Sequence, residues 1–234
     1  MAEQGQPIRL PLAVSPENRD ETANKDAKII NGFVEQVSQD ETWAFKRPGT
    51  AVFSSLPAGV GSGLFNWLGD IYAIVGGTLY KNGLAVGAVQ SDGFPWTFTG
   101  LMGITQKLFL KCNAYAYTYD TMNGLVRVDT STGFPTPNAY GQAYLDGTVY
   151  LSQNPHTLRG SGINDVTTWD ALNAIQAQIE PDTVLALQKQ LVYVIAFKQW
   201  SVEVFYDAGN AAGSPLGPVQ GAKVNVGCRD GRSI

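Results

Sequence analysis

The residues that could support catalysis are few in this chain. A single histidine, His156, is the base through which any Ser-His-Asp mechanism would have to run. Ser62 and Ser161 lie among glycines, but neither stands in the G-x-S-x-G turn that presents a nucleophilic serine. A lone loop histidine is far more often an ordinary polar residue. We therefore expect no acyl-transfer site and assign no catalytic residue.

Acidic residues raise the question of glycoside hydrolysis, which needs two carboxyl groups about 5 to 10 Å apart. Asp70, Asp120, Asp146 and Glu203 are candidates, but no spacing in the sequence selects a pair. The segment Ser91–Trp96 (SDGFPW) is faintly similar to the Asp-box of sialidase-type propellers, yet it occurs once and its proline is misplaced. A propeller hydrolase is the least favoured class of function, and we predict that the chain is not an enzyme.

Cofactor and metal signals are also weak. Cys112 and Cys228 lie far apart with no second thiol near either, which predicts neither a disulfide framework nor a zinc site and favours a reducing compartment. The glycine groups fit neither a dinucleotide-binding fingerprint nor a Walker loop, so we interpret them as turn glycines. These glycines are Gly59, Gly61, Gly63, Gly76 and Gly77.

Five aromatic residues could form flat platforms on which sugar rings stack, as a glycan- or receptor-binding module requires. They fall in strand-like segments with a period of two, where aromatic side chains more often fill the core. The core interpretation is favoured, and the binding module stays open as an alternative. The residues are Trp96, Trp169, Trp200, Tyr193 and Tyr206.

The chain carries little charge. Asp, Glu, Lys and Arg make up 15% of its 234 residues, against roughly 25% in ordinary globular proteins. Such a composition suits a subunit covered largely by other subunits, and equally a lightly charged monomer. The net charge of −4 argues against a sequence-independent nucleic-acid clamp, which relies on clustered Lys and Arg. The polar start and the lack of a long apolar run predict neither a secretory signal nor a membrane span.

The strongest strand pattern lies between Gln190 and Asp207 (QLVYVIAFKQWSVEVFYD). Its second half alternates apolar with mixed residues, as a strand with two different faces does, and its first half is apolar at nearly every position. The segment predicts an antiparallel hairpin that turns at Lys198 and Gln199.

Weaker copies of this hairpin recur at intervals of about 40 residues. Tyr72, Phe109, Tyr150 and Tyr193 occupy matching places in the first arms. Repeats of this length with a strand, turn, strand signal are typical of β-propeller blades, although an all-β sandwich also shows short strands at regular spacing. The 26 glycines and 12 prolines suit many turns. We therefore predict an all-β, β-propeller-like fold.

The chain is predicted to have two parts. Residues 1–28 are polar with spaced prolines and suit an extended N-terminal arm, and residues 29–234 suit the β-propeller-like domain. Within that domain, residues 170–179 are the one helical candidate, and residues 219–226 form a last strand. No closing feature follows, so we expect the propeller to be incomplete in this chain and to continue beyond residue 234 or be completed by other material.

The order of several motifs resembles that of the packaged-DNA stabilisation or tail nozzle proteins of short-tailed bacteriophages (podoviruses). Each motif is weak alone, and their shared order from Ala27 onward carries the resemblance. Family members are usually about twice as long, so the chain resembles their N-terminal half, and Val166 stands where a proline is common. The matching segments are NGFVE at 31–35, RPG at 47–49, GTLYK at 77–81, INDVTTWDALN at 163–173, EPD at 180–182, the 190–207 hairpin with SVEVFY at 201–206, Gly209, Gly221 and Gly227-Cys228.

The resemblance implies a structural subunit of the virion tail with no cofactor. It implies a homo-oligomeric, sixfold ring that continues the portal-adaptor channel, retains the packaged DNA and conducts it during genome ejection. The implied partners are further copies, adaptor or portal-side tail proteins, tail fibre or spike proteins, and genomic DNA that passes without sequence-specific binding. Assembly would take place in the host cytoplasm, with no membrane in the virion. A weakly acidic wall would let DNA slide, and head-to-tail contacts can close into a ring.

Overall fold

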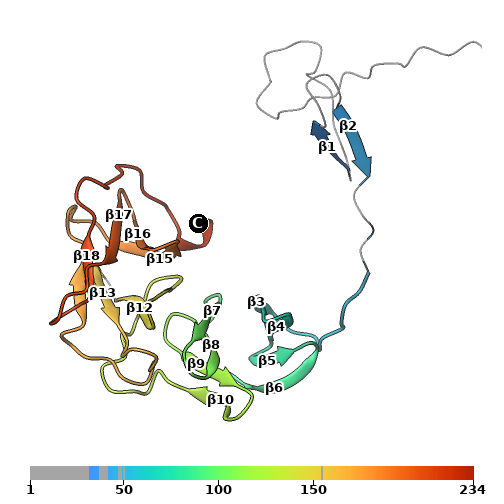
Figure 1. Cartoon of the computed structure of the whole chain (residues 1–234). Coiled ribbons are helices and arrows are strands. Elements are labelled where there is room, and N and C mark those ends of the chain that lie inside the picture. The colour runs from blue at the N-terminus through green and yellow to red at the C-terminus, as the bar shows by residue number, and fades with distance from the viewer. Residues whose placement is uncertain (1–31, 37–41, 47–48, 50, 154) are drawn as a thin grey trace, which may run out of the picture. The chain divides into compact units, whose positions relative to one another are not determined.

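A computed structural model of the chain describes residues 32–36, 42–46, 49, 51–153 and 155–234 (Figure 1). The chain divides into two compact units, Met1–Phe53 and Ser54–Ile234. In the first unit, β1 (Gly32–Gln36) pairs antiparallel with β2 (Thr42–Lys46). The rings of Trp43 and Phe45 lie 6.1 Å apart between centroids. The arm predicted at residues 1–28 lies outside the described residues.

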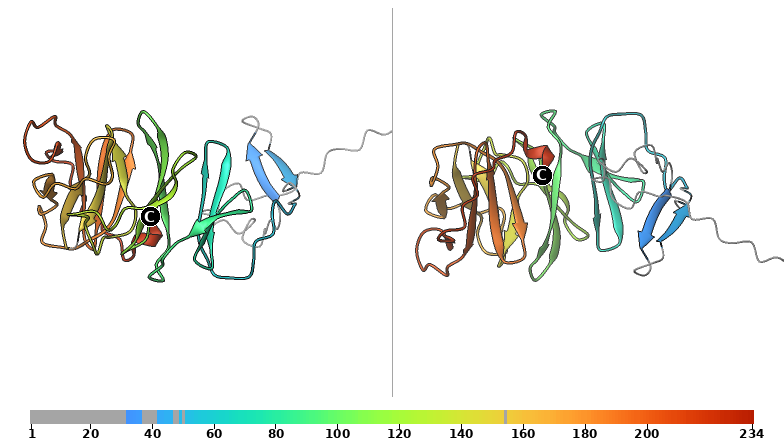
Figure 2. Two further views of the ribbon diagram at one scale, coloured as in Figure 1. Left: turned by 90° about the horizontal axis from the view of Figure 1, so that it is seen from below. Right: turned by 90° about the horizontal axis from the view of Figure 1, so that it is seen from above.

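The second unit consists of four four-stranded antiparallel sheets, which follow one another in chain order (Figures 1 and 2). Each sheet is an up-and-down meander of consecutive strands, which is the construction of a propeller blade, so the predicted fold is confirmed. Blade 1 contains β3 (Gly61–Trp67), β4 (Asp70–Val75), β5 (Thr78–Lys81) and β6 (Leu84–Ala88); blade 2 contains β7 (Thr97–Met102), β8 (Gln106–Lys111), β9 (Ala116–Asp120) and β10 (Gly124–Arg127); blade 3 contains β11 (Ala143–Leu145), β12 (Thr148–Gln153), β13 (Thr157–Gly160) and β14 (Ala174–Gln176); blade 4 contains β15 (Val184–Gln190), β16 (Tyr193–Lys198), β17 (Val202–Asp207) and β18 (Leu216–Pro218).

Turn chemistry sets several of the hairpins. Both residues of the Gly76-Gly77 turn have positive φ, 57° and 76°, and so do both residues of Asn82-Gly83, at 49° and 86°. Two successive positive φ angles define the tight turn that matches the right-handed twist of the flanking strands. The interpretation of Gly76 and Gly77 as turn glycines is therefore confirmed.

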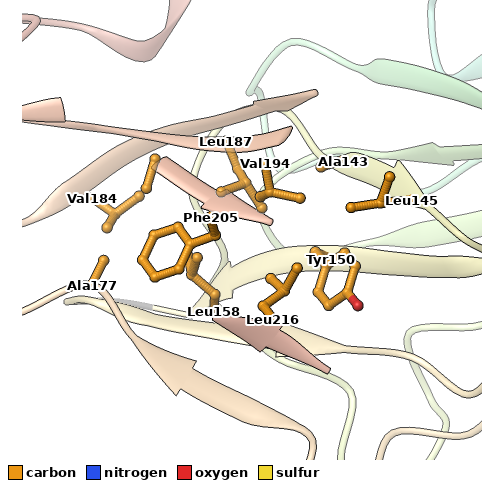
Figure 3. Packing of buried hydrophobic residues seen from close by; sticks show 11 residues of the cluster. Ala143, Leu145, Tyr150, Leu158, Ala177, Val184, Leu187, Val194, Phe205 and Leu216 are labelled. Atoms are coloured by element: carbon orange, nitrogen blue, oxygen red, sulfur yellow. The ribbon is translucent and has the colours of Figure 1, made fainter. Parts of the chain in front are cut away.

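The hydrophobic core lies between successive blades. Three clusters of buried residues join blade 1 to blade 2, blade 2 to blade 3, and blade 3 to blade 4. In β8, Leu108 and Leu110 belong to the first cluster and Phe109 to the second. Figure 3 shows the third cluster, which includes Tyr150 from blade 3 and Phe205 from blade 4. The middle blades are therefore apolar on both faces.

The repeated aromatic position follows this arrangement. Tyr72, Phe109 and Tyr150 all lie in the second strand of their blade, and none is more than 1% exposed. Each packs toward the following blade. Tyr193 also lies in the second strand of its blade, but it is 39% exposed because no further sheet among the described residues covers that face of blade 4. The uncovered face agrees with the predicted incomplete propeller.

Two predicted elements are wrong. Residues 170–179 do not form a helix, because Ala174–Gln176 forms β14 and pairs with β13 at the edge of blade 3. A helix of that length is marginal in water, and the free edge of a sheet offers its backbone more hydrogen bonds. The predicted strand at 219–226 is replaced by β18 at Leu216–Pro218, and only Val224 of that segment forms an isolated bridge, with Val202.

The hairpin of blade 4 also differs from the prediction. Lys198 belongs to β16 and its N–H donates to the carbonyl of Ser201, so the turn lies at Gln199 and Trp200, one residue later than predicted. The buried face of β17 carries Glu203 and Phe205. The core assignment of three aromatics is therefore wrong, because they are exposed by 71%, 39% and 42%; they are Trp200, Tyr193 and Tyr206.

Candidate interaction surface

In each blade the turn between the first and second strands and the connection between the third and fourth strands lie at the same end of the second unit, which we call the tip face. Strand order places these turns and connections at corresponding ends of four aligned sheets (Figure 2). Contacts between blades join them: the N–H of Met102 donates to the hydroxyl of Tyr144, and Val192 and Asp146 line one hollow. The ends of blades 2, 3 and 4 are thus joined to one another at the tip face.

Large apolar side chains project from the tip face. Isolated exposed apolar residues are ordinary, but a row of them at successive turns marks an interaction surface. Leu68 and Leu191 adopt φ of 55° and 53°, a region that costs a side chain with a Cβ roughly 1–2 kcal/mol and that favours Gly, Asn or Asp. The exposed residues and fractions are Leu68 62%, Met102 64%, Ile104 107%, Ile163 75%, Leu191 79% and Val192 61%.

Carboxylates on the tip face are engaged in holding the turns. Asp70 accepts hydrogen bonds from Lys81 and from the amide of Asn82, and these bonds lower the pKa of its carboxyl group. Asp120 accepts from the side chain and N–H of Asn123, which lower its pKa in the same way. The polar groups shape the turns and leave the apolar tips as the exposed feature.

The four candidate carboxylates of a glycosidase belong to four different blades. Asp70 lies in β4, Asp120 in β9, Asp146 in the turn before β12, and Glu203 in β17. Glu203 is 1% exposed and is bound to Lys198. The structure therefore does not bring these residues into one site.

His156 and the two serines have structural surroundings. The carbonyl of His156 accepts the N–H of Ala177, next to the edge of blade 3. Ser161 is 1% exposed; its hydroxyl donates to the carbonyl of Gly162 and accepts the N–H of Val149. The hydroxyl of Ser62 contacts the carbonyl of Ile74 in blade 1. His156 and Ser161 lie in blade 3 or its connections and Ser62 lies in blade 1, so they do not form one set.

Blade 4 contains a buried ionic network that sequence reasoning missed. The ammonium of Lys198 lies 2.7 Å from Glu203 and 2.8 Å from Asp182, and its side chain is 0% exposed. Burial by itself would raise the pKa of Asp182, but hydrogen bonds from Lys198, Trp200 and Ser201 outweigh it and lower the pKa. The second carboxylate oxygen of Glu203 is buried without a partner among the described residues. The alternation in β17 gave no sign that its polar face would be the buried one.

Other predicted site residues have clear positions. Trp96 and Trp169 are each 4% exposed, which confirms their core assignment; Trp169 packs edge-on against Phe134. Trp200 instead lies beside a hollow of about 410 Å³ with Glu180, Asp182 and Asn225. Both cysteines are free.

Two further findings concern the described part of the chain only. None of its His, Cys, Asp and Glu residues gather in a group of three that could hold a metal ion. It contains no helix with the length and apolar character needed to cross a membrane.

The fold and the tip face define a β-propeller whose exposed surface, rather than a catalytic cleft, is its candidate working part. A comparison with protein families gives the particular group. The model described as "Bacteriophage P22 Gp10, beta-propeller" matches residues 31–231, and the chain belongs to this family of phage DNA-stabilisation and tail nozzle proteins. It is thus a structural phage protein and a virion component with a role in DNA stabilisation, which confirms the resemblance inferred from the motifs.

Other comparisons add little. No curated protein matches the chain. The computationally designed protein Ika4 is 13% identical with a TM-score of 0.48, over 68% of this chain and 99% of that one. Virginiamycin B lyase from Staphylococcus aureus is 8% identical with a TM-score of 0.46, over 83% and 64%. BamB from Moraxella catarrhalis is 10% identical with a TM-score of 0.44, over 80% and 56%. None of these likenesses bears on function.

Proposed function

We propose that the protein is a non-enzymatic subunit of a bacteriophage tail nozzle. Further copies of it form a ring, sixfold as in our sequence-based expectation, that continues the portal-adaptor channel, retains the packaged DNA and conducts it during ejection. Adaptor or portal-side proteins and tail fibre or spike proteins are its neighbours in the virion tail, and DNA passes without sequence-specific contacts. The observation that carries the proposal is family membership over residues 31–231.

Two features of the molecule support this proposal. A subunit packed among others needs apolar surface, and the tip face supplies it across all four blades. The chain is also weakly acidic, with a net charge of −4, so a wall built from it would not bind the DNA backbone tightly. We propose that the tip face packs against a neighbouring subunit of the tail.

Charged substitutions on the tip face test the proposal. Ile104→Asp with Leu191→Asp leaves the blade cores untouched, so the variant is expected to fold but to be excluded from assembled tails. Val226→Asp, at a residue that is 69% exposed in the C-terminal segment, is the control. Electron microscopy of the particles and nuclease sensitivity of their DNA are the measurements. Tails of normal composition that retain DNA in the double variant would rule out the proposed contact.

A glycan-binding function is the second candidate, favoured by Trp200. Its indole is 71% exposed beside a hollow that Glu180, Asp182 and Asn225 also line, and sugar sites combine such a platform with polar side chains. Saturable binding on a glycan array, lost in Trp200→Ala and kept in Trp43→Ala, would support it. Trp43 is a suitable control because it is 54% exposed in the other unit. An array without binding would remove this candidate.

A further inference from the structure

A cavity of about 420 Å³ lies at the end of β8 that is remote from the tip face. The connection before blade 2, the connection before blade 3, the start of β15 and the segment 229–232 surround it. Its lining includes three basic side chains, Lys111, Arg229 and Arg232, and one carboxylate, Asp230. A volume of this size is in the range of small-molecule sites, which run from about 300 to 1,000 Å³.

Lys111 is the unusual group in this cavity. It is 1% exposed, and its ammonium donates to the side-chain carbonyl of Asn138 and the backbone carbonyl of Ala139. Both acceptors are neutral, and among the described residues Lys111 forms no ion pair. An ammonium has three N–H groups, so one of them has no acceptor in these contacts. Burial lowers the pKa of Lys111 to about 7.

A second buried lysine among the described residues, Lys198, has the counter-ions that Lys111 lacks. Lys198 is 0% exposed, as deeply buried as Lys111, but it lies within 2.8 Å of two carboxylates. A buried charge without a counter-charge is costly, and proteins normally pair it. The chain therefore places carboxylates in direct contact with Lys198, whereas no described carboxylate forms an ion pair with Lys111.

The two relevant carboxylates, Asp92, whose charge acts on Lys111, and Asp230, which lines the cavity, already accept other hydrogen bonds. Asp92 accepts the N–H of Phe94 and, at 2.7 Å, the N–H of Ala114. Asp230 is held by Arg232, whose Nε lies 3.0 Å from it. Arg229, by contrast, lines the cavity, is exposed, and forms no ion pair or hydrogen bond with another described residue. The lining is therefore cationic although the chain as a whole is acidic.

We propose that this cavity binds a small molecule bearing an oxyanion group, such as a phosphate or sulfate, held between the ammonium of Lys111 and the guanidinium of Arg229. The anion supplies the missing counter-charge and accepts the third N–H of Lys111. Arg229 adds the paired donors that suit a tetrahedral oxyanion. The remaining volume leaves room for an organic group attached to the oxyanion. This site is independent of the tip face and of the ring proposed above.

Calorimetric titration of the full chain with sodium sulfate, sodium phosphate and a nucleoside monophosphate tests the site. The wild type is expected to bind saturably; tighter binding of the monophosphate identifies an organic phosphate as the ligand class, and equal binding identifies the free ion. Arg229→Gln should weaken binding by roughly 10-fold and Lys111→Met by roughly 10- to 100-fold. Lys189→Met, at an exposed residue of β15 outside the lining, is the matched control and should bind as the wild type does.

Sulfate has a constant charge between about pH 6 and pH 8, so its affinity for the wild type can be measured across this range. This pH series tests the role of Lys111 without the Lys111→Met variant, and it therefore does not depend on whether that variant folds. The other charged or titratable groups around Lys111 are Asp92, Asp230, Arg229, Arg232 and Cys112. Hydrogen bonds from Arg232 lower the pKa of Asp230 to about 2, and burial raises the pKa of the Cys112 thiol, so neither group changes its charge toward pH 6. Sulfate affinity should therefore rise several-fold as Lys111 becomes protonated toward pH 6. Absence of saturable binding of all three probes, or equal affinity in the wild type and Arg229→Gln, would overturn the proposal.

Discussion

At the scale of single residues, buried charge is the feature that most distinguishes this chain from a simple apolar propeller. The ammonium of Lys198 in blade 4 forms ion pairs with Asp182 and Glu203, and one carboxylate oxygen of Glu203 has no partner among the described residues. The network joins the β16–β17 turn to the connection at 180–182, because Asp182 also accepts the N–H groups of Trp200 and Ser201. It therefore fixes, through polar contacts, the end of blade 4 that is opposite the tip face.

Removing the central lysine should be costly. Lys198→Met would leave Asp182 and Glu203 buried without their cation, and we expect the free energy of unfolding to fall by about 3–5 kcal/mol. Lys223→Met is the control, since it breaks the partly exposed pair with Glu180 and should cost less than about 1 kcal/mol. Urea denaturation followed by tryptophan fluorescence measures both. Similar losses in the two variants would contradict a structural role for the buried network.

The lowered pKa of Asp120 predicts a pH effect. The hydrogen bonds from Asn123 and Met122 favour its ionised form, so its pKa in the folded protein lies below the ordinary value of 3.8. Its contribution to stability is complete above that value and is lost as the pH falls through the lower folded value. The free energy of unfolding should therefore fall between about pH 5 and pH 2, and less steeply in Asp120→Asn. Equal pH dependence of wild type and variant would exclude this contribution.

At the scale of elements, the connection between blades 2 and 3 has a second role. Tyr140 forms a parallel bridge with Ala186, and its carbonyl accepts the N–H of Leu187, so the connection lies along the edge strand of blade 4. Gly141 makes this approach possible: its φ is 72°, and a Cβ there would lie 2.3 Å from the carbonyl oxygen of Leu187.

Gly141→Ala should therefore be more destabilising than a glycine substitution with backbone strain alone. Gly124 has a similar φ of 67°, but a Cβ there meets nothing within 4 Å. We expect Gly124→Ala to cost about 1–2 kcal/mol and Gly141→Ala clearly more, because both a strained φ and a clash with backbone must be relieved. Thermal unfolding compares the two variants. Equal melting temperatures would mean that the connection shifts away from β15 without cost.

Sequence patterns located most blades but few of their edges. Tyr72, Phe109 and Tyr150 marked second strands correctly, because strands buried on both faces need a large apolar residue there. The edge strands β14 and β18 were missed: Ala174–Gln176 has only three residues and lies within the predicted helix, and Leu216–Pro218 contains Gly and Pro. Such segments become strands through the hydrogen bonds that a neighbouring strand offers, and a single sequence does not show the neighbour.

The candidate surfaces were even less accessible to sequence reasoning. Leu68 and Leu191 occupy turn positions where Gly, Asn or Asp would be expected. Because they are apolar, the sequence pattern assigns them to the neighbouring strands. Lys111 ends a strand, as many exposed lysines do, and only the fold shows that it is enclosed. The tip face and the anion cavity lie at opposite ends of the unit, and each is formed by segments from several blades.

At the scale of the whole molecule, the division into two units predicts that the blades fold without the first unit. All three core clusters consist of residues between 65 and 216, within Ser54–Ile234. A fragment of residues 54–234 should therefore unfold cooperatively, with a free energy of unfolding within about 1 kcal/mol of the full chain. Urea denaturation of both proteins is the measurement. The control is the same fragment with Phe205→Ala, whose free energy of unfolding should fall by about 3–5 kcal/mol if the measured transition includes the core between blades 3 and 4. If the fragment binds hydrophobic dyes and unfolds without cooperativity, residues 1–53 must contribute to the core, and the division into units does not describe how the protein folds.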